Sequence, residues 1–156
     1  MPKKVKPIPD GYHTATPYLV VDNGARALDF YGRAFGAVEV MRMPAPGGRI
    51  GHAEIKIGDS HIMLADEAPE MDARSAKHYG GSPVSILLYV PDVDKVFDQA
   101  VAAGATPTRP VADMFYGDRS GTLKDPFGHS WHISTHKEDL SSDEIAKRME
   151  AMHHKH

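Results

Sequence analysis

Residues 17–36 read PYLVVDNGARALDFYGRAFG, and residues 86–104 read ILLYVPDVDKVFDQAVAAG. Each stretch runs from an apolar, strand-like segment through a turn containing Asp into apolar residues at helical spacing, and each closes with glycine. Three further strand-like runs follow each copy. The sequence therefore predicts one strand–helix–strand–strand–strand unit, present twice. Equivalent positions in the two copies share an offset of 69 residues: Val21/Val90, Leu28/Phe97 and Asp29/Asp98.

Turn-forming and capping residues set the boundaries of these elements. Asp22 or Asn23 is expected to cap the first helix, and Asp92 the second. The capping box at residues 141–144, which begins with Ser141, is expected to open the final helix. Strands are predicted at residues 14–21 and 115–124, among others. Pro107 and Pro110 interrupt the strand predicted at residues 106–111, which indicates that it lies at a sheet edge or contains a bulge. The chain is thus divided into an extended arm at residues 1–12, modules at about 14–66 and 84–136, a linker at 67–83, and a final helix at 141–152.

The composition is typical of a globular protein, with 25% charged and 41% hydrophobic residues in a chain of 156. A formal net charge of -3 gives no reason to expect nucleic acid or an anionic membrane surface as a partner. The apolar runs are too short to cross a bilayer. The absence of cysteine removes disulfides and thiolate metal ligands, and it favours a cytoplasmic location.

Two motifs occur in the order that a known superfamily shows. The segment LDFY (residues 28–31) lies in the first helix, and GDRSGTLKDPFGHSWH (residues 117–132) contains the turn before the last strand. Together they resemble the vicinal oxygen chelate superfamily, which includes glyoxalase I, bleomycin-resistance proteins, fosfomycin-resistance enzymes and extradiol dioxygenases. The second segment is similar to the PhnB-like branch. The resemblance implies an α+β fold in which residues 1–156 form one glyoxalase-like domain, with two βαβββ modules building a curved mixed sheet around a cleft.

The resemblance also implies where a metal would be held in the enzymes of this superfamily, namely on the first and last strands of each module. Alignment on the glycine turns places these four positions on Thr16, Met63 (or Ile62 if the hairpin shifts by one), Ser85 and His132. Only His132 is a common ligand for divalent metals. We therefore expect no metal cofactor. We also expect His132 to form a hydrogen bond with Ser85, with Thr16 or with a backbone carbonyl.

A second arrangement of metal ligands remains open in the first module. His52 and Glu54 share one face of a strand, and His61 shares a face with Met63 on the neighbouring strand. If His52, Glu54 and His61 converged, they could hold zinc or nickel through three protein ligands. The other interpretation is that the strand face formed by His52, Glu54 and Lys56 is simply exposed to solvent.

Side chains that share a strand face with these positions are expected to line the cleft. They combine hydroxyl, aliphatic and aromatic groups, a mixture suited to a mainly apolar small molecule with a few polar anchors. Trp131 points to the opposite face and is expected to pack under the helices. Arg119 is expected to pair with Asp118 or Asp125, or with an anionic ligand. The predicted ligand-binding residues are Thr16, Tyr18, Met63, Ser85, Leu87, Tyr89, Tyr116, Ser130 and His132.

The resemblance leaves three functions open, and the sequence does not decide whether the protein is an enzyme. The first is a small-molecule binding protein that lacks the usual metal centre and resembles the bleomycin-resistance proteins in this respect. The alternative is a metal-dependent lyase, isomerase or dioxygenase that polarises substrate oxygens. A third is metal-free catalysis with His132 as the general base. The resemblance further implies a homodimer, since superfamily members commonly pair their halves across subunits.

Overall fold

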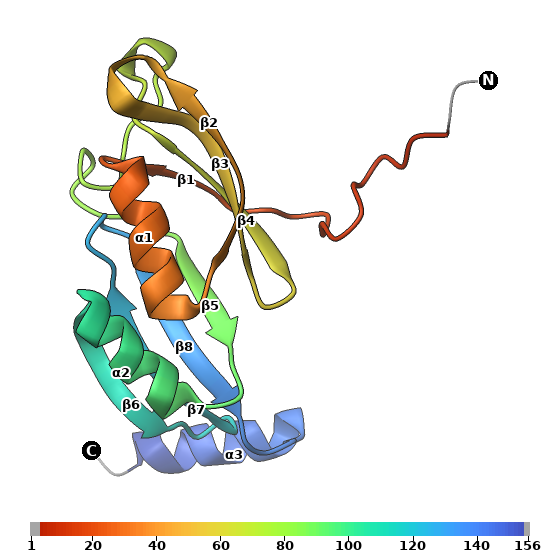
Figure 1. Ribbon diagram of the computed structural model, residues 1–156. Coiled ribbons are helices and arrows are strands. Elements are labelled where there is room, and N and C mark those ends of the chain that lie inside the picture. The colour runs from red at the N-terminus through yellow and green to blue at the C-terminus, as the bar shows by residue number, and fades with distance from the viewer. Residues whose placement is uncertain (1–3, 155–156) are drawn as a thin grey trace. The chain divides into compact units, whose positions relative to one another are not determined.

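The duplicated sequence folds into two compact units, the first ending at Gly81 and the second beginning at Ser82. The computed structural model describes residues 4–154 of the chain. Each unit contains one four-stranded mixed sheet with a helix packed against it, as Figure 1 shows. The α+β class and the two βαβββ modules are therefore confirmed.

The first unit has the strand order β1-β4-β3-β2, with β1 parallel to β4 and the other pairs antiparallel. Its first strand is shorter than predicted, because Pro17 has no amide hydrogen to donate. Thr16 consequently lies just before the strand. The elements are β1 (Tyr18–Val21), α1 (Gly24–Phe35), β2 (Val38–Ala45), a 3-10 turn (Pro46–Gly48), β3 (Arg49–Ile57), β4 (Ser60–Asp66) and a second 3-10 turn (Pro69–Met71).

The second unit repeats this topology with the order β5-β8-β7-β6. The strand that contains Pro107 and Pro110 is at the sheet edge and carries two register shifts, as predicted. The next strand begins later than expected, because Met114–Gly117 closes a turn in which Gly117 N donates to Met114 O over 3.1 Å. The elements are β5 (Ser85–Tyr89), α2 (Val93–Ala103), β6 (Thr106–Asp113), β7 (Asp118–Lys124), β8 (Ser130–His136) and α3 (Ser142–His153).

Each helix begins at a polar residue that accepts a backbone hydrogen bond. Asn23 accepts from the amide of Arg26 over 3.1 Å, and Asp92 accepts from that of Lys95 over 3.2 Å. Ser141 accepts from the amide of Glu144 over 3.1 Å and so caps α3. Such caps satisfy amides that have no partner within the helix, which is why short polar residues select the starting points.

The linker predicted at residues 67–83 is partly ordered by its own contacts. Ala68 and Ala73 form an antiparallel bridge, and Ser75 and Ala76 are buried. The amide of Ser75 donates to Glu67 Oε1 over 2.9 Å. Hydrogen bonds from Ser75 hold the pKa of Glu67 below its ordinary value, so this carboxylate is charged at neutral pH.

One face of each sheet forms the core with its helix. In the first unit, α1 packs its buried Tyr31 and Ala34 on the side of the sheet that carries Ile55 and Leu64. In the second unit, α2 covers the side that carries Leu123, Trp131 and Ile133. Trp131 is fully buried, in agreement with its predicted position under the helix.

Two local features shape the core of the second unit. Gly121 leaves room for the ring of Phe97, because a Cβ atom at this position would lie 2.8 Å from Phe97 Cε2. The turn before β8 is organised by Asp125, whose carboxylate accepts from the amide of Phe127 and from the indole of Trp131, each over 2.8 Å. No helix in residues 4–154 is long and apolar enough to cross a membrane.

Candidate functional site

The two faces of the second sheet differ in chemistry. Leu123 on β7 and Trp131 and Ile133 on β8 point toward α2. Because side chains alternate along each strand, the residues next to them point away from α2. We call this side the open face of the second sheet. It is polar along its middle and partly apolar on β5, where Leu87 and Tyr89 are 45% and 63% exposed. Its members are Ser85, Leu87, Tyr89, Ser120, Thr122, Ser130, His132 and Ser134.

His132 is the centre of a hydrogen-bond chain on this open face. Its Nε2 lies 3.0 Å from Ser85 Oγ, and its Nδ1 lies 2.9 Å from Thr122 Oγ1. The contact with Ser85 was predicted from the sequence. Both ring nitrogens therefore have hydroxyl partners, which fixes the orientation of the imidazole.

Arg109 is the residue that connects this chain to the rest of the face. Its Nη2 donates to Thr122 Oγ1 over 3.1 Å and to Ser120 Oγ over 3.3 Å. Its Nη1 donates to the carbonyl of Ser120 over 3.2 Å and approaches Met114 Sδ at 3.3 Å. The guanidinium is thus held over the middle of the sheet by neutral acceptors.

Two buried serines support this arrangement from below. Ser120 and Ser134 are 1% and 0% exposed, and Ser134 Oγ donates to Ser120 Oγ over 2.8 Å. Because each hydroxyl has a partner, the polar layer under Arg109 carries no penalty for unsatisfied groups. A buried, bonded layer of this kind keeps the guanidinium in one place.

The chain links the guanidinium to the surface. A guanidinium only donates, so Thr122 Oγ1 accepts from Arg109. In the tautomer that carries its proton on Nε2, His132 accepts from Thr122 at Nδ1 and donates to Ser85 Oγ. Ser85 is exposed, and in this arrangement its hydroxyl proton is available to a ligand. The chain can therefore transmit polarisation from Arg109 to a group at the surface.

Sequence reasoning missed Arg109, Ser120 and Thr122. Arg109 lies between two bulges, since the register passes from Pro107 opposite Leu123 to Arg109 opposite Thr122, and shifts again before Ala112. A count of alternating positions cannot be carried through a bulge. The prolines on either side of Arg109 were the available signal, because they marked the strand as irregular.

Two of the predicted residues lie away from His132. Tyr89 directs its hydroxyl to Asp118 Oδ2 over 2.7 Å, and Tyr116 lies in the β6–β7 turn with its ring against Phe115 at a centroid distance of 5.2 Å. Leu87 and Ser130 are on the open face, opposite His132 and Ser85 in the β5–β8 register. The predicted set is therefore only partly gathered around the imidazole.

Asp118 forms a second polar cluster at the start of β7. Besides Tyr89, it bonds His136 Nδ1 over 2.7 Å, and His136 Nε2 lies 2.7 Å from Asp139 Oδ1. The hydrogen bond to Asp118 raises the pKa of Tyr89. Hydrogen bonds to Asp118 and Asp139 raise the pKa of His136, because both carboxylates favour the protonated ring.

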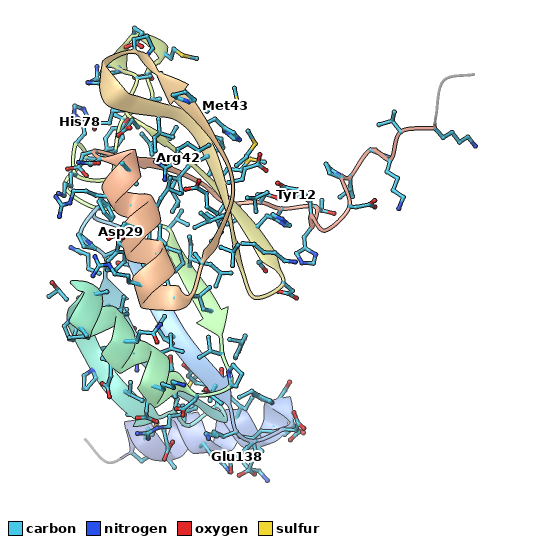
Figure 2. The ribbon with its side chains drawn as sticks, viewed as in Figure 1. Tyr12, Asp29, Arg42, Met43, His78 and Glu138 are labelled. Atoms are coloured by element: carbon cyan, nitrogen blue, oxygen red, sulfur yellow. The ribbon has the colours of Figure 1, made fainter. Side chains whose placement is uncertain are left out.

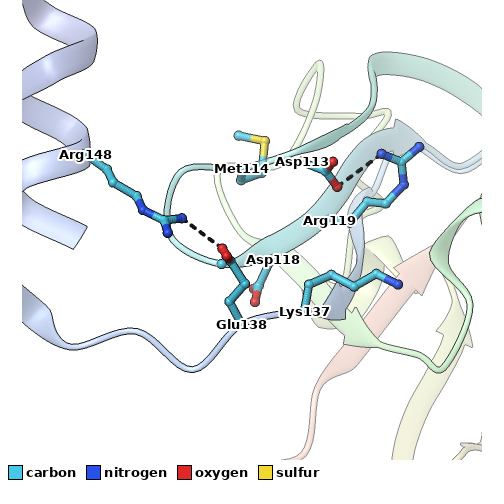
Figure 3. A pocket seen from close by; sticks show the side chains of 8 residues that line it. Asp113, Met114, Asp118, Arg119, Lys137, Glu138 and Arg148 are labelled. Atoms are coloured by element: carbon cyan, nitrogen blue, oxygen red, sulfur yellow. Dashed lines mark hydrogen bonds and ion pairs between the residues drawn. The ribbon is translucent and has the colours of Figure 1, made fainter. Parts of the chain in front are cut away.

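A surface depression of about 600 Å³ lies beside this cluster, and Figure 3 shows its charged lining. Arg119 does not pair with Asp118 or Asp125 as predicted. Its guanidinium instead bonds Asp94 over 2.8 Å and Asp113 over 3.2 Å, because Arg119 follows Asp118 on β7 and so points to the opposite face of the sheet, where α2 carries Asp94. Arg148 pairs with Glu138 over 2.8 Å, which ties α3 to the segment after β8. The lining residues are Asp113, Met114, Gly117, Asp118, Arg119, Lys137, Glu138 and Arg148.

The first sheet also has a face turned away from its helix, and this face carries a different chain of contacts. Tyr18 Oη lies 2.8 Å from His52 Nδ1, and His52 Nε2 lies 3.2 Å from Glu54 Oε2. Burial raises the pKa of Tyr18, so its hydroxyl stays protonated at neutral pH. Met63 is opposite Glu54 in the β3–β4 register, and Thr16 precedes β1.

His61 has its own partners on this side. Its ring stacks on Tyr12 at a centroid distance of 4.0 Å, and its Nδ1 lies 2.9 Å from the carbonyl of Gly11. Tyr12, on the arm that leads into β1 (Figure 2), also donates its hydroxyl to Glu54. Glu54 and His61 are thus both engaged by the arm.

The residues at the four positions that the resemblance assigns to a metal do not form a matching donor set. Thr16 and Ser85 offer hydroxyls, Met63 a thioether and His132 an imidazole whose two nitrogens already have hydroxyl partners. Hard divalent cations prefer carboxylates and imidazoles. Within residues 4–154, no group of three or more His, Asp or Glu side chains is arranged to hold a metal ion, and this includes His52, Glu54 and His61.

Comparison with known proteins gives a consistent family. The family model for the Glyoxalase/Bleomycin resistance protein/Dioxygenase superfamily matches residues 12–133. The uncharacterized protein Rv0887c of Mycobacterium tuberculosis is 42% identical over 137 residues, which cover 86% of this chain and 81% of the relative. TioX from Micromonospora sp. ML1 is 26% identical with a TM-score of 0.63, over 83% of this chain and 100% of its own. A PhnB protein from Bacillus cereus shares the fold at 19% identity and a TM-score of 0.62, over 79% of this chain and 99% of its own.

Proposed function

Because the chain belongs to the Glyoxalase/Bleomycin resistance protein/Dioxygenase superfamily, we propose that it is a small-molecule binding protein whose ligand lies on the open face of the second sheet. The observation that carries this proposal is the hydrogen-bond chain from Arg109 through Thr122 and His132 to Ser85. Arg109, Thr122 and His132 each have at least two hydrogen-bond partners within the second sheet, so the face needs little reorganisation on binding. Preorganised polar groups of this kind reduce the cost of association.

The apolar neighbours of the chain support the same proposal. Leu87 lies opposite His132 in the register and is 45% exposed, and Tyr89 continues the same face of β5. A ligand with an apolar body would cover these side chains while a polar group reached Ser85. Mainly apolar contact with a few convergent polar anchors is the usual composition of a small-molecule site.

We propose that this binding does not use the divalent metal of the superfamily's enzymes. The four positions discussed above offer one imidazole, two hydroxyls and a thioether, and the imidazole of His132 is already bonded on both sides. A metal would have to displace Thr122 or Ser85 to reach it. Metal-dependent lyase, isomerase or dioxygenase chemistry is the alternative that the experiment below tests.

The assembly and the branch are part of this proposal. Exposed apolar side chains on the strands support a homodimer, since a second copy would remove them from water. The shared fold of the PhnB protein from Bacillus cereus supports the PhnB-like branch. Light scattering on a size-exclusion column tests the dimer, and a strict monomer would refute it. The exposed side chains outside the proposed ligand site are Val38, Val40 and Met43, with Tyr18 beside them in the first unit.

A fragment screen on untagged, chelator-treated protein tests the binding function. A set of neutral and charged small aromatic molecules is observed by saturation-transfer NMR, and the amide signals of Ser85 and His132 locate the binders. We expect binding at this face that survives chelation and is weakened by Ser85→Ala and by His132→Ala. Ser60→Ala is the matched control, because it removes a hydroxyl of the first unit that donates to Asp59 and is not part of the proposed site.

Metal analysis of the same samples decides between the two functions. Under the proposal, His132→Ala leaves the metal content unchanged. Stoichiometric zinc, nickel, iron or manganese that returns after chelation and disappears in His132→Ala would instead support the metal-dependent enzyme.

A further inference from the structure

We propose that the ligand carries an oxyanion, a carboxylate or a phosphonate, and that Arg109 is the residue that neutralises it. This inference rests on the proposed binding function and names the class of ligand for the same face. Nothing in the sequence pattern or the family comparison assigns Arg109 a role. The partly buried arginines differ in whether a carboxylate neutralises their charge, and this difference points to Arg109.

Four arginines are partly buried in the part of the chain that the structure describes, and three of them have carboxylate partners. Arg119 bonds Asp94 and Asp113, Arg148 bonds Glu138 and Glu144, and Arg74 lies 3.8 Å from Asp72. Arg109 is the exception among residues 4–154, since its four contacts are two hydroxyls, a carbonyl and a thioether. Its charge is therefore solvated by dipoles and is not neutralised.

A partly buried charge without a counterion is costly, and proteins usually pair it. Neutral acceptors at 3.1 to 3.3 Å hold Arg109 in place but leave the positive potential at the surface of the sheet. Bonds from a guanidinium to the oxygens of a carboxylate or phosphonate are shorter and stronger than those to neutral acceptors, so an oxyanion can displace a weak partner such as the Met114 thioether. The missing partner of Arg109 is thus supplied most simply by a ligand.

The neighbouring acidic groups do not supply that partner. Asp118, at the start of β7, accepts from Tyr89 and bonds His136, each over 2.7 Å. Asp113, at the end of β6, bonds Arg119 over 3.2 Å. Both carboxylates are therefore committed to other groups at the end of the sheet.

The position of Arg109 also orients the rest of the ligand. Thr122 Oγ1 is shared by Arg109 and His132, at 3.1 Å and 2.9 Å, so the guanidinium and the imidazole are separated by a single hydroxyl. An oxyanion bound at Arg109 would lie beside His132, and the ligand body would extend over Leu87. The expected ligand is a small organic acid with an apolar body.

Matched probes test this assignment. Benzoate and benzamide have the same shape and differ in charge, and phenylphosphonate replaces the carboxylate by a larger oxyanion. Binding is followed by the amide shifts of Ser120, Thr122 and His132 in the 15N-labelled full chain. We expect benzoate or phenylphosphonate to bind about tenfold more tightly than benzamide, because only the anions neutralise the guanidinium. The stronger of the two anions identifies the oxyanion class.

Arginine variants separate charge from structure. Arg109→Met keeps much of the side-chain length, and it should remove the preference for the anions. Arg109→Lys keeps the charge without the planar fork and should retain part of the preference. Arg119→Met is the matched control, since it removes an arginine of the same sheet that is already paired, and it should leave the preference unchanged. Amide spectra without ligand check that each variant is folded.

The possible failures are distinguishable. Equal binding of benzamide and benzoate at Ser85 and His132 would overturn the oxyanion assignment and leave the binding function intact. An anion preference that persists in folded Arg109→Met would also overturn it. If none of the three probes shifts these amides, the oxyanion assignment fails, and the fragment screen alone decides the binding function.

Discussion

Asp66 and Thr135 lie 69 residues apart and make the same contact in their own units. Asp66 Oδ1 accepts from the amide of Gly24, the first residue of α1, over 2.7 Å. Thr135 Oγ1 accepts from the amide of Val93, the first residue of α2, over 2.9 Å. The last strand of each module thus holds the N-terminus of its helix. Residues at equivalent positions of the repeat therefore have the same structural role.

Removing these contacts should destabilise each helix locally. Asp66 also accepts from the amide of Ile50 over 2.7 Å, so Asp66→Ala leaves two amides without a charged partner and should cost about 2–4 kcal/mol. Thr135→Val keeps the shape, loses the bonds to Val93 and to the carbonyl of Val90, and should cost about 1–3 kcal/mol. Hydrogen exchange should show faster opening of α1 in the first variant and of α2 in the second. Uniform protection in both variants would contradict this role.

The turn before β8 should depend strongly on Asp125. Its carboxylate accepts from the amides of Phe127 and His129 and from the indole of Trp131, at 2.8 to 3.0 Å, and it is 4% exposed. Asp125→Ala leaves buried donors unpaired and should lower the free energy of unfolding by about 3–5 kcal/mol. Urea denaturation followed by the fluorescence of Trp131, the chain's single tryptophan, measures the effect.

Asp125→Asn is the matched variant for this prediction. It keeps the oxygen that the two amides use, but it turns an amide group toward the Trp131 N–H, where two donors would face each other. We therefore expect the free energy of unfolding of Asp125→Asn to lie between that of the wild type and that of Asp125→Ala. An Asn variant as stable as the wild type would show that the contact with Trp131 contributes nothing.

The cluster around His136 should make stability depend on pH. Asp118 and Asp139 raise the pKa of His136 above its ordinary value of 6.5. The folded state therefore binds the proton more tightly than the unfolded state, and the contribution is fully present below pH 6.5. It is lost as the pH rises through the raised pKa. The urea midpoint should therefore fall as the pH rises from 6.5 through the raised pKa, and NMR titration of the imidazole should give that pKa directly.

His136→Gln provides the control for the pH dependence. Glutamine can still donate a hydrogen bond to one of the carboxylates but does not titrate. The fall of the urea midpoint over this range should be smaller in the variant. An unchanged fall would assign the pH dependence to another group.

The arm before β1 should be released by removal of its tyrosine. Tyr12 stacks on His61 and donates to Glu54, and the exposed Lys6 upstream is a site for trypsin. One such aromatic contact contributes about 0.5–1.5 kcal/mol, which corresponds to about 2- to 13-fold in an opening equilibrium. Tyr12→Ala should therefore accelerate hydrogen exchange of Tyr12's neighbours by about that factor. Tyr12→Phe keeps the stack and should show a smaller effect.

The repeat and the helix starts could be read from the sequence because they depend on local chemistry. The caps Asn23, Asp92 and Ser141 lie where predicted, since short polar residues satisfy free helix amides within three positions. Strand starts were less accurate. Tyr18 rather than Thr14 opens β1, and Asp118 rather than Phe115 opens β7, because a proline and a turn stop the pairing.

The candidate site could be predicted only where alternation holds. His132 and Ser85 were found by counting along regular strands, and their contact is present at 3.0 Å. Arg109 could not be found in this way, because the bulges on both sides of it change which face a residue occupies. Tyr12 was missed because its contact with Glu54 spans 42 residues and comes from an arm without regular structure.

The correspondence of Asp66 with Thr135 has a consequence for how the two halves can change. Register places Glu54 of the first unit where the second has Thr122, and Met63 where the second has His132. The fastening of helix to sheet is equivalent, while the outward side chains are unlike. A substitution on one of these outward surfaces leaves the contact between helix and last strand in its own unit in place. After the duplication, the outward face of one unit could therefore acquire a new binding specificity while that of the other unit kept its original one.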